Sequence, residues 1–178
     1  MDGIELLLEE HENIKKGMTS MKQECAAILE GKEVNTSWFR ELIWFCRNYA
    51  DQHHHGKEEK ILFRLMMQEL GPVAEKLIKS GMLVEHDLGR FHIAELEKAL
   101  DEYDGSKETR WKLEIITNAS EYAGILFRHI EKENEVVYPF AKRSLSKELL
   151  KQMNEETAEF EKTPESEAAR ALLKWLEQ

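Results

Sequence analysis

The sequence predicts an all-α protein, an up-down-up-down four-helix bundle followed by additional short helices toward the C-terminus. Charged residues make up 34% and hydrophobic residues 42% of the 178-residue chain, which contains only 3 prolines. This composition is typical of helices rather than sheets, and the length suits a single core. Four long segments also place apolar residues at steps of three and four, which is the period of one helix face.

The first predicted helix has a single polar residue, His11, on its inner face. Glycine at position 31 ends this helix, and Thr36 or Ser37 is expected to cap the next one. The stripe on the inner face consists of Ile4, Leu7, His11, Ile14, Met18, Met21, Cys25 and Ile28.

The second predicted helix extends from about Trp38 to Leu70 and carries both a histidine and a glutamate on its apolar face. Its stripe consists of Phe39, Ile43, Cys46, Ala50, His54, Glu58, Ile61 and Leu65.

Three adjacent histidines, residues 53–55, leave a choice of register in this helix. A histidine and a glutamate four residues apart lie on one helix face and can share a metal site. The first histidine has a lysine at that spacing, which cannot be a ligand. His54 with Glu58 lies nearest the centre of the stripe, and His55 with Glu59 is the alternative register.

The third predicted helix begins at about Met82, after a break at Gly71 and Pro72, a short helical piece over residues 73–79 and a boundary at Gly81. A histidine again interrupts the apolar row. The stripe consists of Met82, His86, Gly89, Ile93, Leu96, Leu100 and Tyr103.

The fourth predicted helix follows a turn at residues 104–106 and repeats the His-x-x-x-Glu spacing at His129 and Glu133. Pro139 is expected to stop or kink it. Its inner face consists of Trp111, Ile115, Asn118, Tyr122, Ile125, His129, Glu133, Val136 and Phe140. Two polar members of this face, Asn118 and Tyr122, are candidates to support metal ligands.

Two shorter amphipathic helices, Ser146 to Phe160 and Pro164 to Gln178, are expected to pack on the outside of the bundle, with caps at Ser146 and Thr163. The chain therefore divides into a bundle over residues 1–143 and a C-terminal extension over residues 144–178.

The net charge of -10 argues against binding to nucleic acid or to an anionic membrane, and no apolar run approaches the length of a membrane span. The acidic N-terminus does not resemble a signal peptide, so we expect a cytoplasmic protein. Cys25 and Cys46 lie on apolar stripes and are expected to be buried free thiols.

The four histidines of the stripes are expected to meet in one layer of the core. His11 and His54 are 23 and 20 residues from a turn near residue 34, and His86 and His129 are 19 and 24 residues from a turn near residue 105. These differences correspond to heights that agree within about 8 Å in an antiparallel bundle. His92 points about 240° away from His86 and is expected to lie outside the layer.

Imidazoles and carboxylates suit a pair of iron ions, with manganese the next candidate and zinc less suitable because thiolate ligands are missing. An ionised carboxylate in a core costs several kcal/mol unless a partner compensates it. The expected ligand set consists of His11, His54, Glu58, His86, His129 and Glu133.

These residues resemble the hemerythrin-like, or HHE cation-binding, family in type, order and spacing over roughly residues 4–143. The phrases HHGKEEKILF, EHDLGR and HIEKENEVVYP are similar to that family's phrases for its second, third and fourth helices. Ferritin-like bundles are less similar, because they use Glu-x-x-His, a pattern that this sequence lacks. The resemblance implies a non-haem pair of iron ions bridged by an oxo or hydroxo group.

Two departures separate the chain from the oxygen-carrying hemerythrins. Arg90 stands where they have a second histidine on the third helix, and Glu133 follows His129 by four residues, where they have an aspartate at five. The resulting set is more similar to a microbial branch that includes iron-sulfur-cluster repair proteins, many of which carry a short N-terminal domain that is not expected here. Arg90 is then a candidate to support the ligands.

The resemblance implies binding of, or reaction with, dioxygen, nitric oxide or peroxide, with His11 and His54 on one iron, His86 and His129 on the other, and both glutamates bridging. An alternative is a sensor or iron-handling module without catalysis, whose C-terminal helices report to a partner. A third hypothesis is a structural bundle whose polar layer binds nothing.

Overall fold

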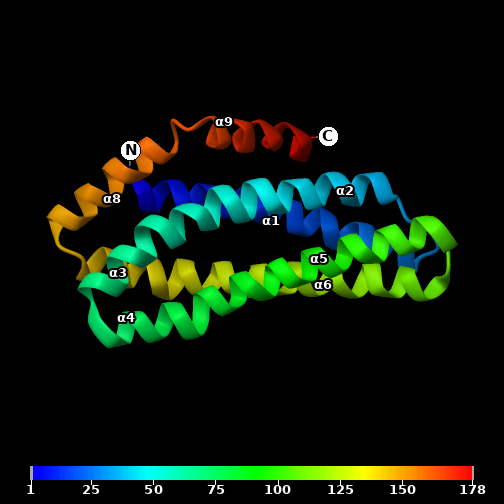
Figure 1. The fold of residues 1–178 in the computed structure, drawn as a ribbon, viewed down its shortest axis with the longest axis horizontal. Coiled ribbons are helices and arrows are strands. Elements are labelled where there is room, and N and C mark those ends of the chain that lie inside the picture. Colours follow the sequence, from blue (N-terminus) through cyan, green and yellow to red (C-terminus); the bar gives the residue numbers. More distant parts are fainter. Residues whose placement is uncertain (1, 178) are drawn as a thin grey trace.

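The computed structural model describes residues 2–177, which fold into four long antiparallel helical rods with two further helices along one side (Figure 1). The all-α, up-down-up-down fold is confirmed. The first rod is α1 (Gly3–Leu29), and the second contains α2 (Thr36–Phe45), π-helical segments Cys46–His55 and Glu58–Leu62, and α3 (Phe63–Glu69). The third contains α4 (Gly71–Leu77), a π-helical segment Ile78–Met82 and α5 (Leu83–Ser106). The fourth contains α6 (Thr109–Lys132), a π-helical segment Glu133–Val137 and α7 (Tyr138–Ser144).

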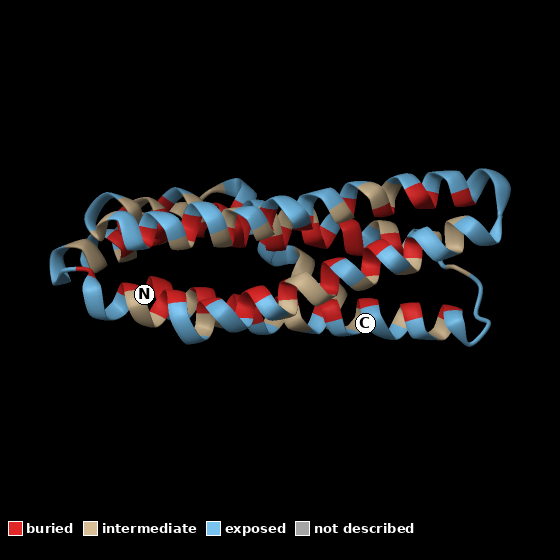
Figure 2. Cartoon of the chain, turned by 90° about the horizontal axis from the view of Figure 1, so that it is seen from below, coloured by how far each residue is buried: buried red, intermediate tan, exposed pale blue. Residues whose placement is uncertain are grey.

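The rods bury the faces that their apolar periodicity predicts. Every residue of the predicted stripes in the first three rods is buried, polar members included. Figure 2 shows these buried faces turned toward the interior of the bundle and the exposed residues turned outward. The buried apolar residues form two groups, one around Ile14 and Phe45 and the other around Leu7 and Phe63. A layer of buried polar side chains lies between the two groups.

The fourth rod differs from the predicted register near its end. Val136 was expected on the inner face but is 48% exposed, whereas Val137 and Tyr138 are buried. The cause is the π-helical segment Glu133–Val137, because a π-turn takes one residue more than an α-turn and shifts the buried face by one position. The helix also continues through Pro139 to Ser144, instead of stopping there.

Some predicted boundaries need correction. The cap of α2 is Asn35, whose Oδ1 accepts a hydrogen bond from the Trp38 N–H at 3.2 Å, rather than Thr36 or Ser37. The predicted turn at residues 104–106 is still helical, and the chain turns at Lys107, which has a left-handed φ of 55°. The predicted boundary at Gly81 lies inside the continuous third rod.

The C-terminal extension consists of α8 (Lys147–Phe160), α9 (Pro164–Ala171) and a final 3-10 turn, Leu172–Glu177. Its predicted caps are confirmed, since Ser146 Oγ accepts from Leu149 N–H and Thr163 Oγ1 accepts from Ser166 N–H, each at 3.2 Å. Figure 1 shows α8 and α9 running along α1 and the second rod. The division into a bundle and an extension at residue 143 stays a prediction.

Both cysteines, Cys25 and Cys46, are buried free thiols, as expected. None of the described helices combines the length and apolarity that a membrane span requires.

Candidate metal centre

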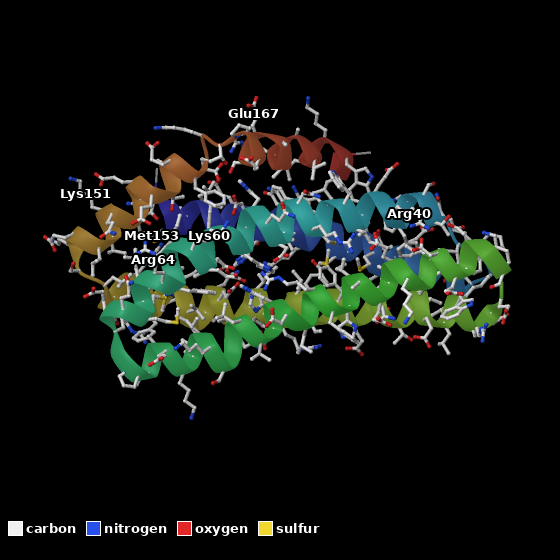
Figure 3. The ribbon with its side chains drawn as sticks, in the orientation of Figure 1. Arg40, Lys60, Arg64, Lys151, Met153 and Glu167 are labelled. Carbon is white, nitrogen blue, oxygen red and sulfur yellow. The ribbon has the colours of Figure 1, made fainter. Side chains whose placement is uncertain are left out.

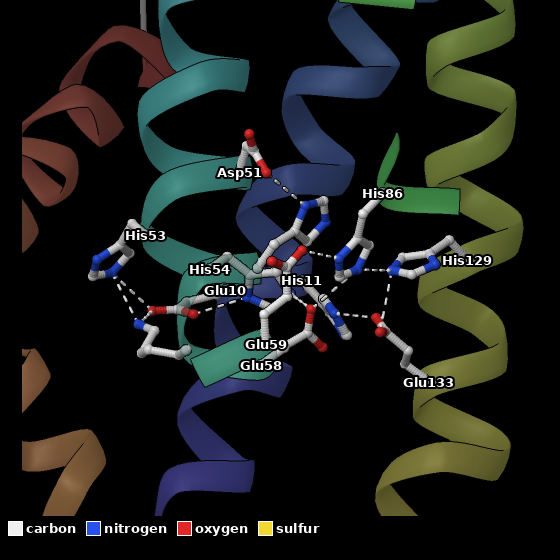
Figure 4. Close-up of polar contacts among 12 residues, drawn as sticks. Glu10, His11, Asp51, His53, His54, Glu58, Glu59, His86, His129 and Glu133 are labelled. Atoms are coloured by element: carbon white, nitrogen blue, oxygen red, sulfur yellow. Dashed lines mark hydrogen bonds and ion pairs between the residues drawn. The ribbon is translucent and has the colours of Figure 1, made fainter. Parts of the chain in front are cut away.

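The polar layer consists of seven side chains that the four rods direct toward one point in the core (Figure 4). Each rod contributes at least one of them, and no side chain in the set is more than 4% exposed. The set consists of His11, His54, His55, Glu58, His86, His129 and Glu133. All six residues of the ligand set expected from the sequence therefore lie together, and His55 joins them.

The seven residues form two groups that share Glu58. In each group the nitrogen and oxygen atoms lie within 4.8 Å of one another. The first group contains His11, His54, Glu58 and Glu133, and the second contains His55, Glu58, His86 and His129. Ligands about 2.1 Å from one ion and at right angles to each other are about 3.0 Å apart, so these groups have roughly the size that one ion each requires.

The two glutamates lie between the two groups. Glu58 Oε2 is 3.7 Å from His54 Nε2 in the first group and 3.6 Å from His86 Nε2 in the second. Glu133 directs Oε2 toward His11 Nε2, at 3.2 Å, and Oε1 toward His129 Nε2, at 3.1 Å. Both carboxylates can therefore bridge the two halves of the cluster.

His54 and His55, which the sequence analysis treats as alternatives, both enter the cluster. They end the π-helical segment Cys46–His55, in which each turn holds more residues and consecutive side chains diverge less than in an α-helix. The His55 ring stacks on that of His86, with ring centroids 3.8 Å apart. Glu59 instead lies outside the cluster and contacts the far side of the His86 ring.

Each of the five histidines turns Nδ1 away from the centre toward a hydrogen-bonding oxygen. A carboxylate can only accept a hydrogen bond, so it favours an imidazole proton on Nδ1 and leaves Nε2 facing the centre, where it could bind a metal. The Nδ1 pairs are His11 with Asn134 Oδ1 at 2.7 Å, His54 with Glu10 Oε2 at 2.9 Å, His55 with Asp51 Oδ1 at 3.4 Å, His86 with Glu59 Oε1 at 2.7 Å and His129 with Glu85 Oε2 at 2.9 Å. Imidazoles that bind metals in proteins are held in this way.

Positively charged side chains bind the carboxylates that orient the histidines. Arg90 binds Asp51 at 2.7 Å and Glu59 at 2.8 Å, so it supports two histidines indirectly. Lys132 pairs with Glu85. Burial alone would raise the pKa of Glu59, but the hydrogen bonds from His86 and Arg90 outweigh it and lower that pKa to about 2.

The other two candidate supporting residues differ in their surroundings. Tyr122 lies beside the cluster, since it lines a cavity of about 90 Å³ together with Cys46, His55 and His86. Asn118 accepts a hydrogen bond from His92 at 3.0 Å and donates to the Glu114 carbonyl, and no hydrogen bond among the described residues joins it to the cluster.

Tyr138 also belongs to the site, although the predicted inner face of the fourth helix did not include it. Its hydroxyl donates to Glu58 Oε1 at 2.5 Å and lies 3.3 Å from His11 Nε2. The π-helical shift after Glu133 turns this residue inward, and the α-helical period gives no sign of that shift. The supporting residues Glu10 and Glu85 were also missed. Their only sequence signal is that each directly precedes a histidine.

The two bridging carboxylates have opposite charge preferences. Burial and the charge of Glu133 raise the pKa of Glu58 well above its usual value. Burial also opposes ionisation of Glu133, but the charges of His129 and His11 outweigh it and hold that pKa low. Burial lowers the pKa of His129, yet Glu133 and Glu85 more than compensate and raise it to about 9. Glu58 thus favours its protonated form, whereas Glu133 favours its ionised form beside a protonated His129.

A third group of possible ligands, Glu10, His53 and Glu161, surrounds the ammonium group of Lys57. Lys57 is 1% exposed. Because this group already encloses a cation, it is not a second metal centre.

Comparison with known protein families agrees with this geometry. The family model described as Hemerythrin HHE cation binding domain matches residues 2–141. The match contains all seven residues of the cluster and ends before α8. No curated protein matches the chain.

Proposed function

The chain belongs to the hemerythrin HHE cation-binding family, and from that premise we propose that its cluster binds two iron ions and that the centre binds or reacts with dioxygen, nitric oxide or peroxide. The established part of this statement is a hemerythrin-like domain with buried candidate metal sites. The metal, its stoichiometry and the reactivity are the proposal.

One observation carries it. Among the described residues, seven buried side-chain nitrogen or oxygen atoms have no hydrogen-bond partner, and five of these belong to the cluster. They are His54 Nε2, His55 Nε2, Glu58 Oε2 and the two oxygens of Glu133, which lie 3.2 and 3.1 Å from Nε2 of His11 and His129 as ion pairs. Leaving a buried polar atom unsatisfied costs about 1 to 3 kcal/mol, and more when it is charged. Metal coordination would satisfy all five atoms at one place.

The donor chemistry favours iron. A mixed set of imidazoles and carboxylates suits iron, with manganese as the next candidate, whereas structural zinc sites more often include thiolates. We assign His11 and His54 to one ion and His55, His86 and His129 to the other, with the two glutamates between them. Iron in such a site supplies redox chemistry and open positions for small ligands.

His55 raises the number of imidazoles in the cluster to five. The absence of a histidine at residue 90 does not leave the cluster one imidazole short, because the second rod supplies two. With Arg90, the chain therefore differs from the oxygen carriers in the position of one histidine, and not in the number of imidazoles at the site. The first group has two imidazoles and two carboxylates, and the second has three imidazoles and one carboxylate, so each group would offer four residues to an ion.

Metal analysis and ligand titration test the proposal together. Protein purified from iron-replete medium should contain about two iron ions per chain. Anaerobic titration of the two-iron form with dioxygen, nitric oxide and peroxide should then change its absorption spectrum for at least one of them. Protein that takes up no iron, and whose behaviour does not depend on iron, would rule the proposal out.

A sensor or iron-handling module is a second candidate, and one observation favours it. The C-terminal extension is in contact with the centre through Glu161, Lys57 and Glu10, which provides a physical route between them. Sustained turnover of peroxide by the iron-loaded protein would favour the first function. Stoichiometric binding without turnover, together with a ligand-dependent change in the protease sensitivity of α8 and α9, would favour the second.

A further inference from the structure

Lys57 lies at the junction of α1, the second rod and the C-terminal extension, with almost no exposure to solvent. Its ammonium group donates to Glu10, to Glu161 Oε1 at 2.6 Å and to His53 Nε2 at 3.0 Å. Arg170 of α9 binds the other oxygen of Glu161. A buried ammonium group is stable only where anions compensate its charge, and two carboxylates do so here.

Glu10 connects this junction to the metal centre because its two oxygens have different partners. Oε1 accepts from Lys57, and Oε2 lies 2.9 Å from His54 Nδ1 (Figure 4). Glu10 is 3% exposed, and α1 fixes its backbone. The orientation of its carboxylate, and with it that of the His54 ring, therefore depends on where Lys57 is held.

Glu161 fixes the position of Lys57 from the side opposite Glu10. It follows the last residue of α8 and lies outside the segment that the family model matches, residues 2–141. A continuous series of contacts thus runs from Glu161 through Lys57 and Glu10 to His54. Groups that orient a metal-binding imidazole influence metal affinity without touching the metal.

We infer that Glu161 is a positioning residue for the metal centre, so that the C-terminal extension sets the affinity of the His11 and His54 half for its ion. The inference rests on the proposed function. It gives the extension a role in the site that the family assignment does not contain, because the supporting charge comes from outside the matched bundle.

Glu156, in the last turns of α8, provides a matched control for Glu161, which follows that helix. It pairs with Arg64 of α3 across the interface between α8 and the second rod, at 2.5 Å, and both side chains are 35% exposed. Figure 3 shows Arg64 on this interface. Glu156 and Glu161 each tie α8 to the second rod through a cation, but only the Glu161 contacts continue to a histidine of the cluster.

The test compares Glu161→Gln, Glu161→Asp and Glu156→Gln with the unchanged full-length chain. Affinity for Co²⁺ and Fe²⁺ is measured by competition with a chromophoric chelator, and the Co²⁺ absorption spectrum reports the ligand geometry. Glu161→Gln should weaken binding of one of the two ions by roughly 10-fold or more and alter the spectrum. Glu156→Gln should weaken it by no more than about twofold, because its ion pair is partly solvated and its contacts do not continue to a histidine of the cluster. Glu161→Asp keeps the charge and should recover part of the affinity.

Equal effects of Glu161→Gln and Glu156→Gln, or unchanged affinity and spectrum for Glu161→Gln, would overturn the inference. Thermal unfolding of the metal-free variants shows whether Glu161→Gln still folds. If it does not, Arg170→Gln, which removes a half-exposed partner of Glu161, should give a smaller loss in the same direction, and no loss would overturn the inference. An unchanged chain that binds neither ion would instead reject the proposed function on which the inference rests.

Discussion

At the scale of single residues, His54 and His55 are neighbours in sequence that serve different halves of one cluster. His54 lies 4.6 Å from His11, measured between ring centroids, whereas His55 stacks on His86 at 3.8 Å. Each also has its own supporting carboxylate. The two imidazoles are therefore not interchangeable, and each should matter for a different ion.

This arrangement predicts that substitution of either histidine removes one bound ion, and a different ion in each case. His54→Ala and His55→Ala should each reduce the iron content from about two ions to about one per chain, because one group loses a ligand while the other keeps its own. Metal analysis of the purified proteins measures the effect. His92→Ala is the control, since His92 bonds Asn118 and belongs to neither group. If only one of the two substitutions lowered the iron content, the division into two groups would be wrong.

At the scale of helices, four π-helical segments lie in three of the four rods, and three of these segments contribute residues to the cluster, including Glu58–Leu62, which begins with the bridging Glu58. Cys46–His55 ends with His54 and His55, and Glu133–Val137 begins with a bridging glutamate. Such segments often occur at functional sites, because they re-aim side chains without ending the helix. Here they add a histidine to the cluster and turn Tyr138 toward Glu58.

The chain reverses direction between the second and third rods at Gly71, whose backbone conformation can be tested against that of Gly81 in the third rod. Gly71 has a left-handed φ of 72°, which a Cβ disfavours, whereas Gly81 is helical and a Cβ there would meet nothing within 4 Å. Gly71→Ala should lower the free energy of unfolding by about 1 kcal/mol. Gly81→Ala should raise it by about 0.5 to 1 kcal/mol. Urea unfolding measures both, and changes of the same sign would contradict this account of the reversal.

At the scale of the whole molecule, the cluster separates two apolar cores. One surrounds Ile14 and Phe45, and the other surrounds Leu7 and Phe63. Each core joins residues from several rods, so the metal-free bundle should remain folded and helical. The buried carboxylates between the cores lower its stability, and bound cations should offset that effect.

Metal removal should therefore lower thermal stability without abolishing the fold. A ligand at 100 times its dissociation constant stabilises a protein by about 2.7 kcal/mol. For a chain of this length, that corresponds to a rise of roughly 5 to 11 °C in Tm. Circular dichroism with iron and with chelator measures the difference. A Tm that does not respond to chelator, in protein shown to contain iron, would argue that the layer is stabilised without its ions.

Sequence patterns alone predict the four rods, the inner stripes of the first three, the caps of α8 and α9, and six residues of the cluster. These features depend on local periodicity and turn chemistry, which act over one or two helical turns. The sequence also predicts that the histidines lie at similar heights along the bundle axis, because the rise of an α-helix per residue is constant.

The remaining side chains of the site are brought in by irregular helical turns and by contacts between helices, which sequence patterns do not reveal. The π-helical turns that bring in His55 and Tyr138 leave no periodic signal, because one additional residue in a turn is compatible with many sequences. The supporting carboxylates Glu10 and Glu85 bond histidines of neighbouring rods, and Glu161 reaches Lys57 across a separation of 104 residues. Contacts of this kind depend on how helices pack against each other, and the period of a single helix contains no information about them.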